Sequence, residues 1–264
     1  MLVTVKTSPQ PSEKYRDTVC VAGIRVDEGH GEWVRLYPIP FRWIGSEQKF
    51  RKYDIVELNI RRRTADSRLE SFTPDMDSLV IQERIDKWKD RAPLVNRVPR
   101  TTVCELSRAA AERHNAPSLG LIDVEDLSAI RHSGWSDRDR ERIAAAMRMP
   151  VEDLFGARLQ APPALTAPRF KVSYRFRCTA RGCTGHNGQI LDWELTELQR
   201  RFENTVDDEL QRAVRHAFVD RMFSNGKQTS FFMGNFEDPV KRHAFSVLGI
   251  YYPDRTAADR LSLF

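Results

Sequence analysis

Over the first ninety residues, hydrophobic and polar positions alternate in short runs. Residues 2–6, 18–24, 32–37 and 53–60 are rich in β-branched and aromatic side chains, and Gly, Pro, Asp and Ser separate the runs. Short alternating runs between turn-forming residues are typical of β-strands that bury one face. The pattern predicts a small β-barrel over residues 1–95.

A helical period then replaces the alternation. Residues 101–116 carry apolar side chains at helical spacing, and Thr101 or Thr102 can cap the first turn. Residues 123–130 and 137–147 show the same signs, with charges three and four positions apart. This part of the chain is therefore predicted to be helical.

A stretch rich in proline and alanine, residues 160–168, favours an extended connector. We therefore end the predicted helical connecting region, residues 96–160, at this stretch. Beyond it, residues 169–177 alternate between apolar even-numbered and mostly basic odd-numbered positions. This alternation predicts a half-buried strand with a basic outer face.

The rest of the chain predicts two helices, residues 191–202 and 207–223, and two strands, residues 230–235 and 244–252. Together with the basic strand they form a second domain, predicted over residues 169–264. The hydrophobic pattern thus predicts an α+β protein with one domain at each end and helical segments between them.

The composition excludes several classes of protein. With 264 residues, of which 41% are hydrophobic and 30% charged, the chain is long enough for two domains and differs from disordered proteins. No uninterrupted apolar run approaches the roughly 18 to 20 residues that span a bilayer, and the N-terminus lacks a signal peptide pattern. We expect a cytoplasmic protein with no membrane partner. The net charge of +5 permits polyanion binding without requiring it.

The four cysteines fall into two groups. Without a secretion signal they are expected to be reduced thiols. Cys20 and Cys104 lie in apolar runs, which favours small buried thiols. Cys178, Cys183 and His186 instead fall within nine residues, at a spacing that a short loop can fold around one ion.

Zinc is the candidate cofactor for this second group, but three ligands leave a structural site one short. The nearest candidates for a fourth ligand are Asp192, His216 and His243. Without a fourth ligand, the ion would keep an open position, as a catalytic zinc does. A structural zinc, a catalytic zinc and a metal-free polar knot with buried thiols all stay open as interpretations.

Two carboxylates follow in the sequence Asp192-Trp193-Glu194. At a helix start, Asp192 is a natural N-cap and Glu194 a favourable first-turn charge. On a strand, with Lys227 returning nearby, the two acids would instead imitate a magnesium-dependent nuclease, in which carboxylates hold the metal and lysine orients water. The cap is the simpler interpretation, and the nuclease is the alternative.

A polyanion site is predicted in residues 33–43, where cations and aromatic rings alternate. Single-stranded nucleic acid is held by cations along its backbone and by aromatic faces beneath its bases. The predicted nucleic-acid-binding residues are Trp33, Arg35, Tyr37, Arg42, Lys49, Arg51, Lys52, Arg61, Arg62, Arg63, Arg175, Arg177 and Arg181. The competing interpretation places the aromatic rings in the core and the arginines on a solvated strand edge.

These features resemble a bacterial family described as dual OB-containing domain proteins. The matching segments are residues 18–24, 32–42, 178–194 and 249–253, and they span nearly the whole chain. The resemblance implies two small OB-like β-barrel domains of the oligonucleotide-binding kind, with nucleic-acid binding in bacterial defence as the expected role. The predicted helices between residues 101 and 147 add mass that a bare pair of such barrels lacks.

We therefore expect a non-catalytic protein that binds single-stranded or structured DNA or RNA. Two alternatives come from other classes of protein. One is a metal-dependent nuclease or phosphodiesterase that uses Asp192, Glu194 and Lys227. The other is an interaction module that binds a partner protein or a modified nucleotide in a barrel pocket.

Overall fold

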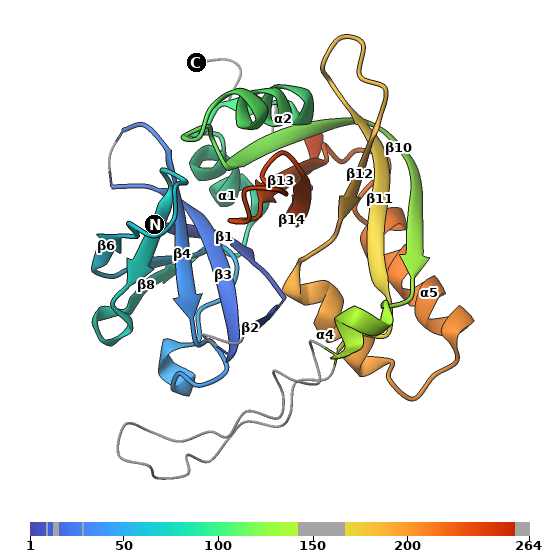
Figure 1. Ribbon diagram of the computed structural model, residues 1–264, viewed down its shortest axis with the longest axis horizontal. Helices are drawn as coiled ribbons and strands as arrows, with labels where there is room; N and C mark the ends of the chain where they lie inside the picture. The colour runs from blue at the N-terminus through green and yellow to red at the C-terminus, as the bar shows by residue number, and fades with distance from the viewer. Residues whose placement is uncertain (9, 13–15, 28, 142–166, 257–264) are drawn as a thin grey trace.

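The computed structural model describes residues 1–256, apart from residues 9, 13–15, 28 and 142–166. Two β-sheets, one from each half of the chain, lie side by side with short helices at their edges (Figure 1). The predicted α+β class is confirmed. Of the helix predicted at residues 137–147, residues 137–141 are helical, and the rest lies outside the described residues.

The N-terminal sheet follows the alternation of the sequence. Its strands are β1 (Leu2–Lys6), β2 (Gln10–Ser12), β3 (Arg16–Arg25), β4 (Glu32–Ile39), β5 (Asp54–Glu57), β6 (Ile60–Arg62), β7 (Ser71–Pro74) and β8 (Val80–Arg84). They are hydrogen-bonded in the order β6-β7-β4-β3-β1-β5-β8, and β2 pairs with β3. Two 3-10 turns, η1 (Ser46–Gln48) and η2 (Met76–Ser78), lie in the connections.

This sheet curls into a half-barrel. β1 pairs antiparallel with both β3 and β5, whereas β4 and β7 pair in parallel, with Arg35 opposite Ser71. β6 pairs antiparallel with β7. Only two residues separate β5 from β6, so the strand beside β1 continues into the strand beside β7. The chain itself therefore brings the two ends of the curled sheet together.

The C-terminal half contains the second sheet and most of the helices. Helix α1 (Trp88–Val95) follows the N-terminal sheet, and the elements after it are β9 (Arg100–Thr101), α2 (Val103–Glu112), β10 (Leu119–Ser133), β11 (Lys171–Cys178), β12 (His186–Gln189), α4 (Trp193–Arg201), α5 (Asp207–Arg215), a π-helical turn η3 (His216–Asp220), β13 (Ser230–Asn235) and β14 (Phe245–Tyr251). The strand order is β12-β11-β10-β13-β14, and β9 pairs with β10. The helices predicted after residues 101, 191 and 207 are confirmed as α2, α4 and α5.

The helix predicted at residues 123–130 is wrong, because this segment belongs to the long strand β10. Two register shifts, which are β-bulges or irregularities, interrupt its pairing with β11. A bulge adds one residue to the two-residue period of a strand. Val124, Leu127 and Ile130 therefore recur at intervals of three while all packing against the core, which imitates a helical period. Strand β10 thus occupies part of the predicted helical connecting region.

Strand β10 joins the two parts of the second sheet. Its first residues, Leu119–Asp123, pair with β13, and the residues from Val124 onward pair with β11. A parallel bridge between Ile190, directly after β12, and Val247 of β14 connects the outer strands. The second sheet therefore also curves toward closure.

The two sheets share one apolar core. Leu2 and Ile24 of the N-terminal sheet pack in the same cluster as Leu121, Phe232 and Tyr251 of the second sheet, and all five are buried. Strands β13 and β14 lie between the N-terminal strands and β10–β12 (Figure 1). Burial of each such side chain stabilises the fold by roughly 1.5–3 kcal/mol, so this shared cluster stabilises the contact between the two sheets.

Among the described residues, no helix has both the length and the apolar character needed to cross a membrane.

Candidate metal centre and basic face

Three thiols and one imidazole converge where α2 meets the second sheet. The ligand atoms of Cys104, Cys178, Cys183 and His186 all lie within 4.8 Å of one another. Cys178 Sγ is 3.7 Å from Cys104 Sγ and 3.6 Å from Cys183 Sγ. His186 Nε2 lies 3.5, 3.3 and 3.2 Å from the sulfurs of Cys104, Cys178 and Cys183. The Cys3His cluster, as we call these four residues, has the donor set of a structural zinc site.

The spacing of these atoms fits a tetrahedron around one ion. With Zn–S near 2.3 Å and Zn–N near 2.0–2.1 Å, tetrahedral angles place two sulfurs about 3.8 Å apart and a sulfur and a nitrogen about 3.5 Å apart. The sulfur–sulfur distances of 3.6 and 3.7 Å are close to the first value. The three nitrogen–sulfur distances, 3.2 to 3.5 Å, are close to the second. The cluster could therefore hold zinc with little rearrangement.

The local fold explains how a short loop supplies three of the ligands. Cys178 is the last residue of β11 and His186 is the first residue of β12. Between them the chain turns through Gly182 and Gly185, whose φ angles are 76° and 107°. These left-handed conformations favour glycine, because a Cβ atom strains them. The turn carries Cys183 back toward Cys178 and His186.

The fourth ligand comes from a distant part of the sequence. Cys104 is the second residue of α2, directly after the N-cap Thr102 and Val103. Thr102 and Glu105 form a capping box, in which each side chain accepts a hydrogen bond from the other's backbone N–H. This cap fixes the first turn of the helix and thereby the direction of the Cys104 side chain.

Burial and hydrogen bonds within the cluster shift the pKa values of Cys104, Cys178 and His186 in different directions. Burial raises the pKa of Cys104 to about 12, and its hydrogen bond with Cys178 and the charge there act in the same direction. Burial also opposes ionisation of Cys178, but hydrogen bonds from the backbone N–H groups of Ala180 and Cys104 hold its pKa below the ordinary value. Burial lowers the pKa of His186 and keeps the imidazole neutral. A bound divalent cation would stabilise all three thiolates together.

The sequence-based expectations for this cluster need two corrections. Cys104, predicted to be an inert buried thiol, is half-buried and completes the ligand set. The predicted fourth ligands are elsewhere: Asp192 caps α4, His216 is exposed at the end of α5, and His243 is exposed in the β13–β14 connection. Cys104 lies 74 residues before Cys178, so local spacing carried no signal for it.

Asp192 and Glu194 stand at the start of α4, as the capping interpretation predicts. The Asp192 side chain accepts a hydrogen bond from the backbone N–H of Glu194. Asp192 Oδ2 also lies 2.5 Å from Lys52 Nζ, and Glu194 Oε1 lies 3.4 Å from the same nitrogen. Burial raises the pKa of Asp192 to about 6, although the positive charge of Lys52 opposes this shift. The acid therefore links the two halves of the molecule.

The predicted lysine of a nuclease site is engaged elsewhere. Lys227 Nζ lies 2.7 Å from Asp254 Oδ1, in a bridge between the segments before β13 and after β14. The lysine that contacts Asp192 is Lys52, and both side chains are almost fully buried. The three residues predicted for the nuclease alternative thus do not form one site.

Arg35, a predicted nucleic-acid contact, is buried in the molecule. It is 3% exposed, and its Nη2 donates hydrogen bonds to the carbonyl and hydroxyl oxygens of Ser118, at 3.0 and 3.1 Å. Ser118 in turn donates from its backbone N–H to a carboxylate oxygen of Glu70 at 2.8 Å. Arg35 therefore joins β4 to the segment before β10, and the prediction that it contacts nucleic acid is wrong for this conformation.

Other members of the predicted binding stretch are also occupied within the protein. Trp33 is half-buried and packs edge-on against Phe232, with ring centres 6.1 Å apart. The Arg63 guanidinium lies 4.9 Å from the centre of the Tyr37 ring. Trp33 thus packs against the core while staying partly exposed, and its role in binding stays a prediction.

Two of the predicted cations are held in ion pairs. The Lys52 side chain is 10% exposed beside Asp192, and the Arg63 side chain is 11% exposed beside Glu237, at 3.1 Å. A cation already paired and shielded from solvent is poorly placed to meet a phosphate. Sequence spacing cannot distinguish such cations from exposed ones.

The remaining predicted contacts are half-buried or exposed. They are Arg42, Lys49, Arg51, Arg61, Arg62, Arg175, Arg177 and Arg181. Arg175 and Arg177 are alternate residues of β11 and share one outer face, and Asn187 of β12 lies opposite Arg175. Arg177 is 3.7 Å from Glu125, an exposed pair that contributes little. A role of these residues in binding stays a prediction.

The fold and the cluster define an α+β protein with a Cys3His group able to hold a metal ion. The chain belongs to the family described as Domain of unknown function (DUF8757), whose model matches residues 99–264. Residues 1–97 match a second model, described as Domain of unknown function (DUF8758). The two matches meet at Val98, just before β9. No curated protein matches the chain.

Proposed function

We propose that this protein binds nucleic acid through two OB-like barrels, and that zinc in the Cys3His cluster holds part of the binding face in place. The observation that carries the proposal is the strand connectivity of the two sheets. In an OB fold, five strands form a partly open Greek-key barrel, and oligonucleotides bind on the face of strands 2 and 3 and in the neighbouring loops.

The strand pairing in each of the two sheets is consistent with the strand order of an OB fold. In the second sheet, β10 pairs with β11 and β13, β11 pairs with β12, and β13 pairs with β14. The bridge from Ile190 to Val247 adds a parallel contact between the third and fifth strands. In the N-terminal sheet, β1 pairs with β3 and β5, and the third strand, β4, pairs in parallel with β7. The same cyclic order therefore occurs twice.

The binding face on this proposal is the outer surface of β11 and β12, the second and third strands of the second sheet. Arg175 and Arg177 project from it, and Arg181 lies in the loop that joins the two strands. Within the described residues of these strands, the aromatic side chains Tyr174 and Phe176 point inward and are buried. Contacts to phosphates should therefore dominate over base stacking, so binding should depend strongly on salt and little on sequence.

Zinc has a structural role on this proposal. Four protein ligands leave no open position for substrate, unlike the three ligands of a catalytic zinc. Cys178, Cys183 and His186 enclose the loop that carries Arg181, and Cys104 fastens this loop to α2. Zinc would thereby fix the end of the binding face nearest the loop.

Zinc analysis and a salt titration test the proposal. The purified protein should contain one zinc per chain by elemental analysis. Fluorescence anisotropy with labelled single-stranded DNA and RNA should show binding at low salt that weakens steeply as salt rises. The R175A/R177A variant should weaken binding, and the log–log salt slope should fall by about 0.7 for each phosphate that is no longer neutralised.

The matched control removes the same charge elsewhere. The R201A/R212A variant loses two exposed arginines from α4 and α5, so it changes the net charge without changing the β11 face. It should bind nearly as the unaltered protein does. Equal weakening in both variants would show that only net charge matters, and absence of binding to either nucleic acid at low salt would refute the proposed function.

A further inference from the structure

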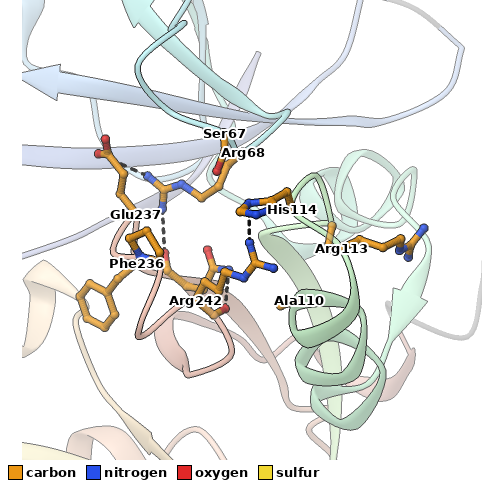
Figure 2. A pocket seen from close by; sticks show the side chains of 11 residues that line it. Ser67, Arg68, Ala110, Arg113, His114, Phe236, Glu237 and Arg242 are labelled. Carbon is orange, nitrogen blue, oxygen red and sulfur yellow. Dashed lines mark hydrogen bonds and ion pairs between the residues drawn. The ribbon is translucent and has the colours of Figure 1, made fainter.

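A small pocket lies where two loops from different halves of the molecule meet. The loop between β6 and β7 supplies Ser67 and Arg68, and the loop between β13 and β14 supplies Glu237 and Arg242. His114, just after the end of α2, completes the wall (Figure 2). On the proposed barrel connectivity, both loops join the fourth strand to the fifth, a position that contacts ligands in OB folds.

The cationic side of the pocket is only partly neutralised. Arg242 Nη1 lies 2.8 Å from His114 Nδ1, and among the described residues no carboxylate is found to pair with Arg242. A neutral imidazole nitrogen that accepts from a guanidinium leaves the arginine charge uncompensated. Figure 2 shows the two side chains pointing toward each other beside the pocket. An anion there would meet an arginine with unused donors.

The opposite wall is rigid and electrically balanced. Arg68 donates to both carboxylate oxygens of Asp66, with Nη2 to Oδ2 at 2.7 Å, and to the backbone carbonyl of Asn235 at 2.8 Å. Glu237 pairs with Arg63 at 3.1 Å. Two acids therefore face two arginines, and the net positive charge of the pocket comes from Arg242.

The size of the pocket restricts its ligand. Its volume is about 30 Å³. A cavity that holds a single water has a volume of about 10–15 Å³. A small tetrahedral anion fits this space after displacing water, whereas a nucleobase does not. Arginine recognises phosphate with two parallel N–H donors, which adds both affinity and orientation.

We propose that this pocket binds a phosphate group, with Arg242 as the principal donor, His114 as a second contact and Arg68 as a fixed wall whose charge Asp66 balances. The phosphate would replace His114 as the acceptor for Arg242. This inference rests on the proposed function only for the choice of nucleic acid as one source of the phosphate. The pocket residues are distinct from Arg175, Arg177 and Arg181 of the β11–β12 face.

Titration with inorganic phosphate, followed by ³¹P NMR line broadening and calorimetry, tests the pocket directly. R242A should weaken phosphate binding about tenfold or more, because a hydrogen bond to a charged group contributes about 1.5–3 kcal/mol. R108A is the matched control, since Arg108 is an exposed arginine of the same helix, α2, that does not line the pocket. It should change the affinity less than about twofold, the scale of an exposed charge. H114A should give an intermediate loss.

A comparison of two oligonucleotides, one with a 5′-phosphate and one with a 5′-hydroxyl group, distinguishes a terminal phosphate from an internal one. A 5′-phosphorylated single strand that binds more tightly than its 5′-hydroxyl counterpart, with the difference abolished in R242A, identifies a terminal phosphate. Equal binding of the two strands, weakened alike by R242A, identifies an internal phosphodiester. Loss of inorganic phosphate binding by R108A and R242A to the same degree, or no phosphate binding by the unaltered protein, overturns the inference. The R175A/R177A variant should still bind inorganic phosphate, so the two proposals can fail separately.

Discussion

Lys52 Nζ lies 2.5 Å from Asp192 Oδ2, and the two side chains are 10% and 1% exposed. Lys52 precedes β5 in the N-terminal half, and Asp192 caps α4 in the C-terminal half. Their ion pair therefore lies across the junction of the two family matches. A buried pair contributes little net stability compared with apolar residues, but loss of one partner leaves an uncompensated charge.

The K52A substitution should accordingly destabilise the whole molecule. Removing the lysine leaves Asp192 buried without its cation, and the expected loss in free energy of unfolding is about 3–5 kcal/mol. Urea denaturation followed by circular dichroism measures it. K49A is the control, because Lys49 is exposed, and it should change stability by less than about 0.5 kcal/mol. Similar stabilities of the two variants would contradict the structural importance of the pair.

The C104S substitution should weaken zinc binding by more than about a hundredfold, because serine oxygen is a poor zinc ligand and a three-ligand site remains. Competition with a chromophoric chelator measures the affinity. C20S is the control, since Cys20 lies outside the cluster and contacts Arg35. If C104S retains the zinc affinity of the unaltered protein, Cys104 is not a ligand.

The R35A substitution should lower stability rather than nucleic-acid affinity. It removes two hydrogen bonds to Ser118 across the sheets, and the expected cost is about 3 kcal/mol from the missing charged hydrogen bonds and packing. Thermal melting measures the loss. Anisotropy at a temperature where R35A stays folded should show binding close to that of the unaltered protein. Normal stability combined with weak binding would instead mean that Arg35 contacts nucleic acid.

Asp66 should make stability sensitive to acid. Burial alone would raise its pKa, but hydrogen bonds from Arg68 hold the folded-state pKa at about 2, below the usual 3.8. Because the folded pKa is depressed, this stabilisation is present above about pH 4 and is lost as the pH falls to about 2, amounting to at most about 2 kcal/mol.

The D66N variant tests this acid sensitivity. It should be less stable than the unaltered protein near neutral pH, and the difference should shrink between pH 4 and pH 2 in urea denaturation. D77N, at an exposed acid, serves as the control. A difference between D66N and the unaltered protein that stays constant over this range would show that the Asp66 charge contributes nothing to stability.

Elements with an uninterrupted period were predictable from the sequence. The alternation in residues 169–177 is the strand β11, and Asp192 caps α4 as its position before an apolar period predicts. Strand β10 was not predictable by the same rule. Because of its register shifts, residues three apart in the sequence, Val124 and Leu127, both pack against the core. A period of three arises from a bulged strand as readily as from a helix.

The candidate site residues also fall into two groups, those that the sequence identified and those that it did not. Local spacing identified Cys178, Cys183 and His186, which lie on one loop. Cys104 was missed, because its proximity depends on how α2 packs against β11. Arg35 was misassigned for a related reason, since an arginine within a strand carries no sign of whether the facing element is solvent or the opposite sheet.

The position of Cys104 would tie metal binding on the proposed function to a late stage of folding. During synthesis Cys104 emerges 82 residues before His186, so the complete ligand set exists only after β10, β11 and the glycine-containing turn have been made. A metal that prefers four ligands would bind tightly only to chains in which α2 has docked on these strands. Zinc uptake would then act as a check on assembly, separating chains with a finished second sheet from those still lacking one.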